Sequence, residues 1–304
     1  MERVWGGREL ELVYQRVLPS SGVPFGESWE IVDREEACSV VRDGPLKGKT
    51  LSELWQEHRD EIFGSEYAAH DGPFPILIKI LDARDDLSIQ VHPPLHLADS
   101  LGGEPKTEMW VIAAAEPGAK LHVGMKHGVS DDDFRRAIAD GTVADCVHAI
   151  EPKPGQFIFI PSGRLHAIGA GFLIHEIQQN SDTTYRVFDW NRMGLDGKPR
   201  ELHVDASLAS IDFDDFEPGM NDPVGSLLAD CPFFRTERFS LLENERIDSG
   251  NPDRFAIIGL IEGMLEDAGG RVFKAGDYFL LPCGGAGLAA SMPCTALRVT
   301  LPVS

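Results

Sequence analysis

One segment constrains the fold of this chain more than any other, Gly155-Gln-Phe-Ile-Phe-Ile-Pro161-Ser-Gly163-Arg-Leu-His166. The aromatic and β-branched side chains of residues 157–160 predict a strand that is buried on both faces. Pro161 and Gly163 end this strand and turn the chain. His166 then opens a second apolar run, which puts an imidazole beside a tight turn where it can point into the mouth of a barrel. A plain hairpin with a structural histidine is the alternative interpretation.

The same spacing occurs a second time near the C-terminus. The segment Gly276-Asp-Tyr-Phe-Leu-Leu-Pro282-Cys-Gly284-Gly-Ala-Gly287 repeats the frame G-x5-P-x-G, and Gly287 falls at the position of His166. Short strand-like runs occur along the whole chain, so we predict a mainly β protein of two β-barrel units. We expect a metal-binding catalytic domain at residues 1–230 and a metal-free β domain at residues 231–304.

Helices are expected at two places in the first domain. A capping-box pattern beginning at Thr50, followed by an apolar stripe, predicts a helix at 50–63 within an insertion at about 47–70. A shorter helix is expected to begin at Ser130 and to end at Gly141.

The composition excludes several classes of partner. The formal charge is −21, from 49 acidic and 28 basic side chains. Such a surface repels nucleic acid and anionic membranes, and an anionic substrate requires a local basic pocket. No apolar run reaches the roughly 20 residues that span a bilayer, and the N-terminus lacks the apolar core of a signal peptide. The five scattered cysteines fit reduced thiols, so we expect a cytoplasmic protein. The acidic, turn-rich segment 211–230 is expected to be a linker or an exposed connection.

Side chains of the types that bind metals occupy strand positions. The alternating pattern near residue 90 puts Ser88, Gln90 and His92 on one face of a strand. The imidazoles of His92 and His166 and the carboxylate of Glu108 suit a divalent transition metal such as zinc, with Gln90 as a neutral fourth ligand. No cysteine lies in this set, which favours an open catalytic site over a closed structural one. The alternative interpretation is that the polar side chains of each such strand simply face solvent and bind no metal.

The spacing around His166 resembles the second motif of the cupins, which are metal-binding β-barrels. Residues 3–215 as a whole resemble the type I mannose-6-phosphate isomerases, particularly their shorter bacterial form. The matching motifs are Trp5-Gly-Gly with Gly26-Glu27-Ser-Trp29, Asp86-Leu-Ser-Ile-Gln90-Val-His92-Pro93, Lys106-Thr-Glu108-Met-Trp110, Pro161-Ser-Gly-Arg-Leu-His166-Ala-Ile-Gly, and Glu176-Ile-Gln-Gln-Asn-Ser-Asp-Thr-Thr-Tyr-Arg186-Val-Phe-Asp-Trp190. The resemblance implies two cupin-type jelly-roll units with a small helical insertion in the first.

The resemblance also implies an activity and a set of site residues. The activity is the interconversion of mannose 6-phosphate and fructose 6-phosphate through a cis-enediol, with one zinc ion per chain. The implied residues are the zinc ligands Gln90, His92, Glu108 and His166, the catalytic residues Arg186, Lys106 and Glu176, and the substrate-binding residues Glu27 and Ser88.

The chemistry of isomerisation leaves some roles open. Lys106 is two residues from a metal ligand, so we expect its ammonium form to be disfavoured, and it can act as base or as electrophile. Glu176 is the competing base. Arg186 can stabilise the enediolate or hold the phosphate. Structural alternatives are a surface ion pair between Lys106 and Glu176, and a contact of Arg186 with Asp189.

Two other functional classes fit the same pattern. An oxidative cupin would hold iron, although Gln90 is a poor match for its ligand set. A metal-free sugar-binding or structural β-barrel is the third possibility. For the isomerase we expect a small sugar phosphate as the partner, and a monomer or a homodimer.

Overall fold

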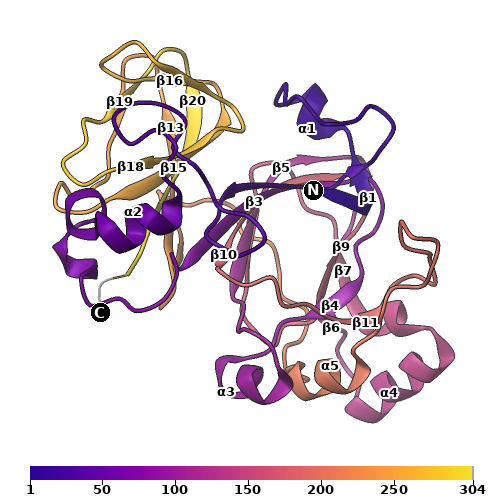
Figure 1. Cartoon of the computed structure of the whole chain (residues 1–304). Coiled ribbons are helices and arrows are strands. Elements are labelled where there is room, and N and C mark those ends of the chain that lie inside the picture. Colours follow the sequence, from indigo (N-terminus) through magenta and orange to yellow (C-terminus); the bar gives the residue numbers. More distant parts are fainter. Residues whose placement is uncertain (303–304) are drawn as a thin grey trace. The chain divides into compact units, whose positions relative to one another are not determined.

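The structure, a computed structural model that describes residues 1–302, divides into two compact units (Figure 1). Unit 1 consists of Met1–Ser28 and Ile80–Asp222, and unit 2 of Trp29–Lys79 and the chain from Pro223 onward. Most of both units is antiparallel β-sheet, which confirms the prediction of a mainly β protein. No helix within residues 1–302 is long and apolar enough to cross a membrane.

Two antiparallel sheets make up most of unit 1, and β2 and β3 carry the chain across the boundary between the units. The first has the order β1-β3-β10-β5-β8, with β2 beside β3, and the second has the order β11-β4-β9-β6-β7. The strands of the first sheet are β1 (Glu2–Gly7), β2 (Glu27–Ile31), β3 (Ile76–Ala83), β5 (Glu108–Ala115), β8 (Phe157–Ile160) and β10 (Phe172–Gln179). Those of the second are β4 (Ile89–Val91), β6 (Leu121–Met125), β7 (Val147–Ile150), β9 (His166–Ile168) and β11 (Tyr185–Phe188).

The helices of unit 1 are short. They are α1 (Glu9–Leu12), α3 (Leu95–Ala98) with a 3-10 turn at Asp99–Leu101, α4 (Asp131–Asp140) with a 3-10 turn at Val143–Cys146, and α5 (Val204–Ser210). α4 begins at the predicted place, where Ser130 accepts a hydrogen bond from the Asp133 N–H and the Asp133 side chain bonds back to the N–H of Ser130, forming a capping box. Gly141, with φ of 72°, ends the helix as predicted.

The facing sides of the two sheets enclose one apolar core. Trp110 and Ile112 of β5 lie in the same buried cluster as Val123 of β6 and Ile168 of β9. Because side chains alternate along a strand, Glu108 at the start of β5 points to the same side as Trp110. The sequence of β5 therefore places a carboxylate at one end of an otherwise apolar interior.

The other side of the second sheet packs against α4 and α5 (Figure 1). Ile89 and Val91 of β4 belong to a second buried cluster there, together with Phe134 of α4. The alternation of β4 then directs Gln90 to the opposite side, between the sheets. The polar face predicted for this strand is therefore turned inward and not toward solvent.

Unit 2 also contains two antiparallel sheets, with the orders β12-β13-β20-β15-β18 and β14-β19-β16-β17. The first comprises β12 (Leu227–Asp230), β13 (Arg235–Leu241), β15 (Ala256–Glu262), β18 (Tyr278–Leu281) and β20 (Cys294–Thr300). The second comprises β14 (Arg246–Ile247), β16 (Met264–Glu266), β17 (Val272–Lys274) and β19 (Leu288–Ala290). Its helices are α2 (Leu51–Glu57), a π-helical turn at Arg59–Phe63 and a 3-10 turn at Ser65–Tyr67.

The helical insertion begins at the predicted residue, but it belongs to unit 2. Thr50 forms the predicted capping box at the start of α2. The sequence assigned this segment to the N-terminal domain, whereas the structure groups it with unit 2. Its apolar side packs on Phe255, whose ring centroid lies 5.0 Å from that of Phe63 and 5.5 Å from that of Tyr67. Such a long-range aromatic contact leaves no local pattern in the sequence.

The boundary between the units also differs from the prediction. The segment 211–230 was expected to be a linker or an exposed connection, with the second domain beginning at residue 231. In the structure unit 2 resumes at Pro223, because residues 227–230 form β12 and pair with β13.

The repeated motif occupies equivalent places in the two units. In each copy the first strand lies in one sheet and the next strand, after the turn, lies in the other. His166 opens β9, and Gly287 directly precedes β19. A Cβ atom at position 287 would lie 2.6 Å from the carbonyl oxygen of Ile247. The second copy therefore has no space for a side chain where the first copy has its histidine.

Asp82 is a buried carboxylate near the end of β3 that caps α1. Its exposed fraction is 1%, and Oδ2 accepts hydrogen bonds from the backbone N–H groups of Glu9 at 2.6 Å and Leu10 at 3.4 Å. Burial raises the pKa of Asp82 to about 6, and the two backbone hydrogen bonds offset this effect only in part.

We predict that Asp82→Asn changes the pH dependence of stability. The pKa of this carboxyl is about 6 in the native protein, against an ordinary value of 3.8. Between pH 3.8 and about 6 the native protein therefore holds a proton on Asp82 that the unfolded chain has lost. The wild type therefore gains stability relative to the variant as the pH falls from about 7 to about 4, and loses it as the pH rises through about 6. At roughly 1.4 kcal/mol per pKa unit, the gain is at most about 3 kcal/mol. Urea unfolding at several pH values measures it, and a pH-independent difference would contradict the prediction.

Candidate functional site

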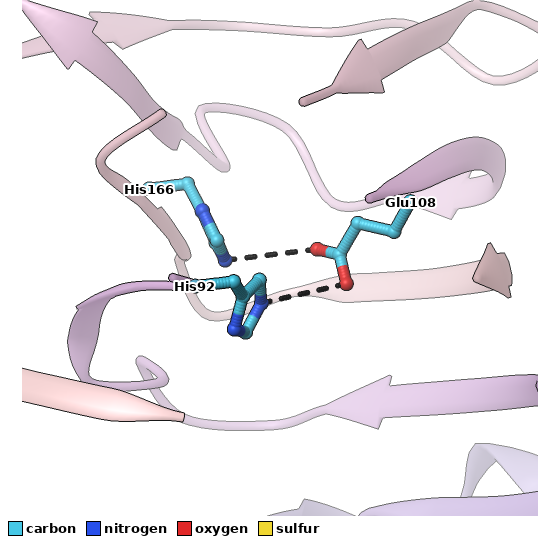
Figure 2. Close-up of side chains that lie close together, drawn as sticks. All are labelled: His92, Glu108 and His166. Carbon is cyan, nitrogen blue, oxygen red and sulfur yellow. Dashed lines mark ion pairs between the residues drawn. The ribbon is translucent and has the colours of Figure 1, made fainter. Parts of the chain in front are cut away.

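Three predicted metal ligands meet at one end of the space between the sheets of unit 1. Glu108 begins β5, His166 begins β9, and His92 directly follows β4. One ligand atom from each lies within 4.8 Å of the others. All three residues are buried, with exposed fractions of 1% or less. Figure 2 shows the Nε2 atoms of both histidines facing the carboxylate of Glu108.

The backbone fixes the orientation of both imidazoles. Nδ1 of His92 donates a hydrogen bond to the carbonyl of Thr183 at 2.8 Å, and Nδ1 of His166 donates to that of Arg164 at 2.9 Å. Since Nδ1 carries the proton, Nε2 presents its lone pair to the cluster. Burial lowers the pKa of His92, and burial together with the neighbouring His92 lowers the pKa of His166 to about 3. Both rings are therefore neutral, as a metal ligand has to be.

Some of the ligand atoms lack a hydrogen bond within the described part of the chain. The Nε2 atoms lie 3.5 and 3.6 Å from the oxygens of Glu108, which is too long for hydrogen bonds. His92 Nε2 and Glu108 Oε1 are buried without a hydrogen bond from residues 1–302, and Glu108 Oε2 has the ammonium group of Lys106 at 2.7 Å. An unpaired buried polar group costs about 1–3 kcal/mol, and a charged one more. Two imidazole nitrogens and a carboxylate converging in this way fit a divalent cation of the zinc type.

A line of polar contacts leads from this cluster to Arg186. The amide Nε2 of Gln90 lies 3.3 Å from His166 Nε2, and its Oε1 accepts a hydrogen bond from Ser88 Oγ at 3.2 Å. Arg186 Nε donates to the same Ser88 hydroxyl at 3.2 Å, and its Nη1 donates to the carbonyl of Glu201 at 3.0 Å. Arg186 and Gln90 are direct partners on β11 and β4. The structure thus brings together three residues that the sequence assigned to three different roles.

Lys106 and Glu176 form a buried ion pair beside the cluster. Lys106 Nζ lies 2.7 Å from Glu108 Oε2 and 3.6 Å from Glu176 Oε1, and both Lys106 and Glu176 are 4% exposed. The interpretation as a surface ion pair is therefore wrong. Trp110, which had no assigned role, donates from Nε1 to Glu176 Oε2 at 3.0 Å.

Two carboxylates determine the charge state of Lys106 in this structure. Burial by itself lowers the pKa of Lys106, but the carboxylates of Glu108 and Glu176 outweigh it and raise this pKa above its ordinary value. The same ammonium group, with the two imidazoles, holds the pKa of Glu108 well below its usual range despite burial. The expectation that the ammonium form is disfavoured concerns the protein with a bound cation, and it stays a prediction.

Glu27, a predicted substrate-binding residue, forms an ion pair with Arg3. Its carboxylate accepts hydrogen bonds from Arg3 Nε at 2.8 Å and Arg3 Nη2 at 3.0 Å, and it is 8% exposed. Arg3 was not among the residues that the sequence selected.

A group of arginines near Arg186 also escaped the sequence analysis. Asp189 accepts hydrogen bonds from Arg192 Nε at 3.1 Å and Arg200 Nε at 2.7 Å, whereas the guanidinium of Arg186 bonds to other groups. Burial, followed by the positive charge of Arg200, lowers the pKa of Arg186. Three arginines around one aspartate are a local basic patch on a chain of net charge −21. Their close spacing in the sequence was the available signal.

Comparisons with known proteins agree with this geometry. Residues 1–105 match the family described as phosphomannose isomerase type I, catalytic domain. The mannose-6-phosphate isomerase ManA of Bacillus subtilis is 36% identical over 298 residues, covering 93% of this chain and 90% of that protein.

Solved structures share the fold. The crystal structure of the mannose 6-phosphate isomerase from Bacillus subtilis superposes with a TM-score of 0.87 at 31% identity, covering 99% of this chain and 97% of that chain. A mannose 6-phosphate isomerase bound with zinc and yttrium has the same fold, with a TM-score of 0.74 at 16% identity and coverage of 99% and 97%. The identity to ManA extends over nearly the full length of both proteins, and the chain therefore belongs to the type I mannose-6-phosphate isomerases.

Proposed function

We propose that this chain is a zinc-dependent aldose–ketose isomerase that interconverts mannose 6-phosphate and fructose 6-phosphate through a cis-enediol, and that unit 1 is a catalytic cupin domain. The observation that carries this proposal is the convergence of His92, Glu108 and His166, some of whose ligand atoms lack a hydrogen bond from residues 1–302, beside the Lys106–Glu176 pair. The names of the relatives and the zinc in a structural neighbour support it.

Four side chains would hold the ion in this proposal, namely Gln90, His92, Glu108 and His166. The amide nitrogen of Gln90 now faces His166, and a half-turn of the amide would present its oxygen to the cluster instead. When bound, zinc supplies Lewis acidity that polarises the sugar oxygens and stabilises negative charge on the enediolate. The set includes no thiolate, which leaves the ion strongly acidic and suits catalysis.

The proton moves between C1 and C2 with the help of Glu176 and Lys106. Glu176 is oriented by Trp110, which bonds Oε2 and leaves Oε1 toward Lys106. A carboxylate fixed in this way is positioned to take a proton from carbon, while the ammonium of Lys106 is positioned to donate to or stabilise a sugar oxygen. The reverse assignment, with Lys106 as the base, is the competing version of this step.

Arg186 and its surroundings would bind the anionic parts of the substrate. Arg186 is anchored by Ser88 and stands on the strand next to Gln90, so its charge is near the proposed metal site. We assign it to stabilising the enediolate, with Ser88 as a substrate contact. The positive charge of Arg192 and Arg200 favours a phosphate group nearby. Glu27 remains a proposed contact to a sugar hydroxyl.

A coupled assay with mannose 6-phosphate tests the proposed activity directly. We expect isomerisation by the purified chain, loss of activity after removal of the metal by a chelator, and recovery after addition of zinc. An active protein that contains no divalent ion would contradict the zinc dependence. A metal-loaded protein without isomerase activity would contradict the reaction.

We predict one tightly held divalent ion per chain. The second copy of the motif has Gly287 in place of a histidine and no space for a side chain there, so only unit 1 should bind an ion. Elemental analysis should give one ion in the wild type and a loss in His166→Ala. His122→Ala, which removes an imidazole of unit 1 outside the cluster, is the matched control and should retain the ion. Two ions per chain, or full retention in His166→Ala, would overturn this prediction.

We predict that Glu176→Gln separates the two possible bases. Glutamine keeps an acceptor for Trp110 but lacks the basic carboxylate. If Glu176 takes the proton, kcat should fall roughly 10²- to 10⁴-fold and KM should change little. The variant should also lose the exchange of substrate hydrogen with deuterated water, followed by NMR. Exchange that persists in Glu176→Gln and disappears in Lys106→Met would assign the base to Lys106 instead.

We predict that Arg186→Ala lowers kcat with little effect on KM. An interaction that forms only as charge develops acts on the transition state. Loss of one such charged donor typically costs about 2.7–4 kcal/mol, or on the order of 100- to 1,000-fold in rate. Arg186→Lys tests the need for the planar guanidinium, and Arg136→Ala is a control on an exposed helix. A raised KM with unchanged kcat would show that Arg186 binds the phosphate in both states.

A further inference from the structure

Both histidines of the cluster are fastened to one turn, which joins β8 to β9. Nδ1 of His166 donates to the carbonyl of Arg164 at 2.9 Å, and the N–H of Gly163 donates to the carbonyl of His92 at 3.0 Å. Gly163 adopts a φ of +91°, a conformation that other residues rarely adopt. The positions of both imidazoles therefore depend on the shape of this turn.

The side chain of Arg164 stabilises the same turn through hydrogen bonds to Phe159 and Asp215. Its Nη1 donates to the carbonyl of Phe159 at 2.7 Å. Its Nε and Nη2 donate to the two oxygens of Asp215 at 2.8 and 2.7 Å, in a bidentate pair whose side chains are each 17% exposed. A bidentate pair of this kind fixes the plane of the guanidinium as well as its position. The residue whose carbonyl orients His166 is thus immobilised by its own side chain.

Asp215 is itself fixed to the second sheet. Its carbonyl accepts a hydrogen bond from the N–H of Met125 in β6 at 2.9 Å, and the N–H of Glu217 donates to the carbonyl of Met125 at 3.0 Å. Three residues earlier, the N–H of Asp212 donates to the carbonyl of Gly163 at 2.8 Å. The segment 212–217, which the sequence suggested was part of a linker or an exposed connection, therefore braces the turn that precedes His166.

We propose that Arg164 and Asp215 are a positioning pair that holds His166 in ligand geometry and thereby sets how long the protein retains its metal. The inference rests on the proposed role of His166 as a metal ligand. Groups that orient a ligating histidine typically change metal affinity 10- to 100-fold when they are replaced. Without Asp215 the guanidinium retains only the carbonyl of Phe159, and the turn gains freedom to carry His166 away from Glu108.

The test is the rate at which the holoenzyme releases zinc to an excess of a chromogenic chelator. We expect Asp215→Ala to release zinc about 10- to 100-fold faster than the wild type. The thermal unfolding midpoint of the metal-free protein is measured alongside, because a purely structural role would lower this midpoint without changing the rate of zinc release. Glu217→Gln is the matched control. Glu217 lies in the same segment as Asp215, but its side chain accepts a hydrogen bond from the N–H of His127 and does not contact Arg164. It should release zinc at the wild-type rate.

Two conservative variants keep the test decisive if Asp215→Ala folds poorly. Asp215→Glu retains a carboxylate, and Arg164→Lys retains the charge but not the planar fork, so both should release zinc at intermediate rates. Wild-type release from Asp215→Ala and Arg164→Lys would overturn the positioning pair alone, and so would equal acceleration in Glu217→Gln. A wild-type protein that binds no zinc would overturn the proposed metal site as well.

Discussion

The carboxylate of Glu108 is completely buried, and its charge has to be balanced inside unit 1. Transferring an ionised carboxylate from water into a protein interior costs several kcal/mol unless an opposite charge compensates for it. Lys106 provides part of this compensation at 2.7 Å, but Glu176 adds a second negative charge nearby. The two imidazoles are neutral, so the cluster keeps an excess of negative charge that a cation would offset. A cation at this position would also contact His92 Nε2 and Glu108 Oε1, which have no hydrogen bond from residues 1–302.

The residues of this cluster could be predicted because strand geometry is local. The two-residue period of β4 and β5 determines which side chains share a face, and the motifs identified the polar ones. The sequence could not determine which face turns inward. Ile89 and Val91 pack under α4, and this contact sends Gln90 to the interior. A fully polar face on a short strand is therefore ambiguous until its partner helix is known.

The missed features all depend on contacts between distant parts of the chain. Asp215 was read as part of an acidic linker or exposed connection, because its bidentate bond to Arg164 joins residues far apart in sequence. The grouping of the helical segment near residue 63 with unit 2 was missed for the same reason, since Phe255 provides its packing surface. Composition and periodicity carry no information about such pairs.

The glycine at position 287 has an evolutionary consequence for the two-fold repeat. A Cβ atom there would collide with a backbone carbonyl 2.6 Å away, and a main-chain atom cannot move aside as a flexible side chain can. A single codon change could therefore not give the second unit an imidazole at this position without shifting the strand beside it. Main-chain geometry therefore keeps this position of the second unit without a side chain, whereas the first unit has His166 at the equivalent position.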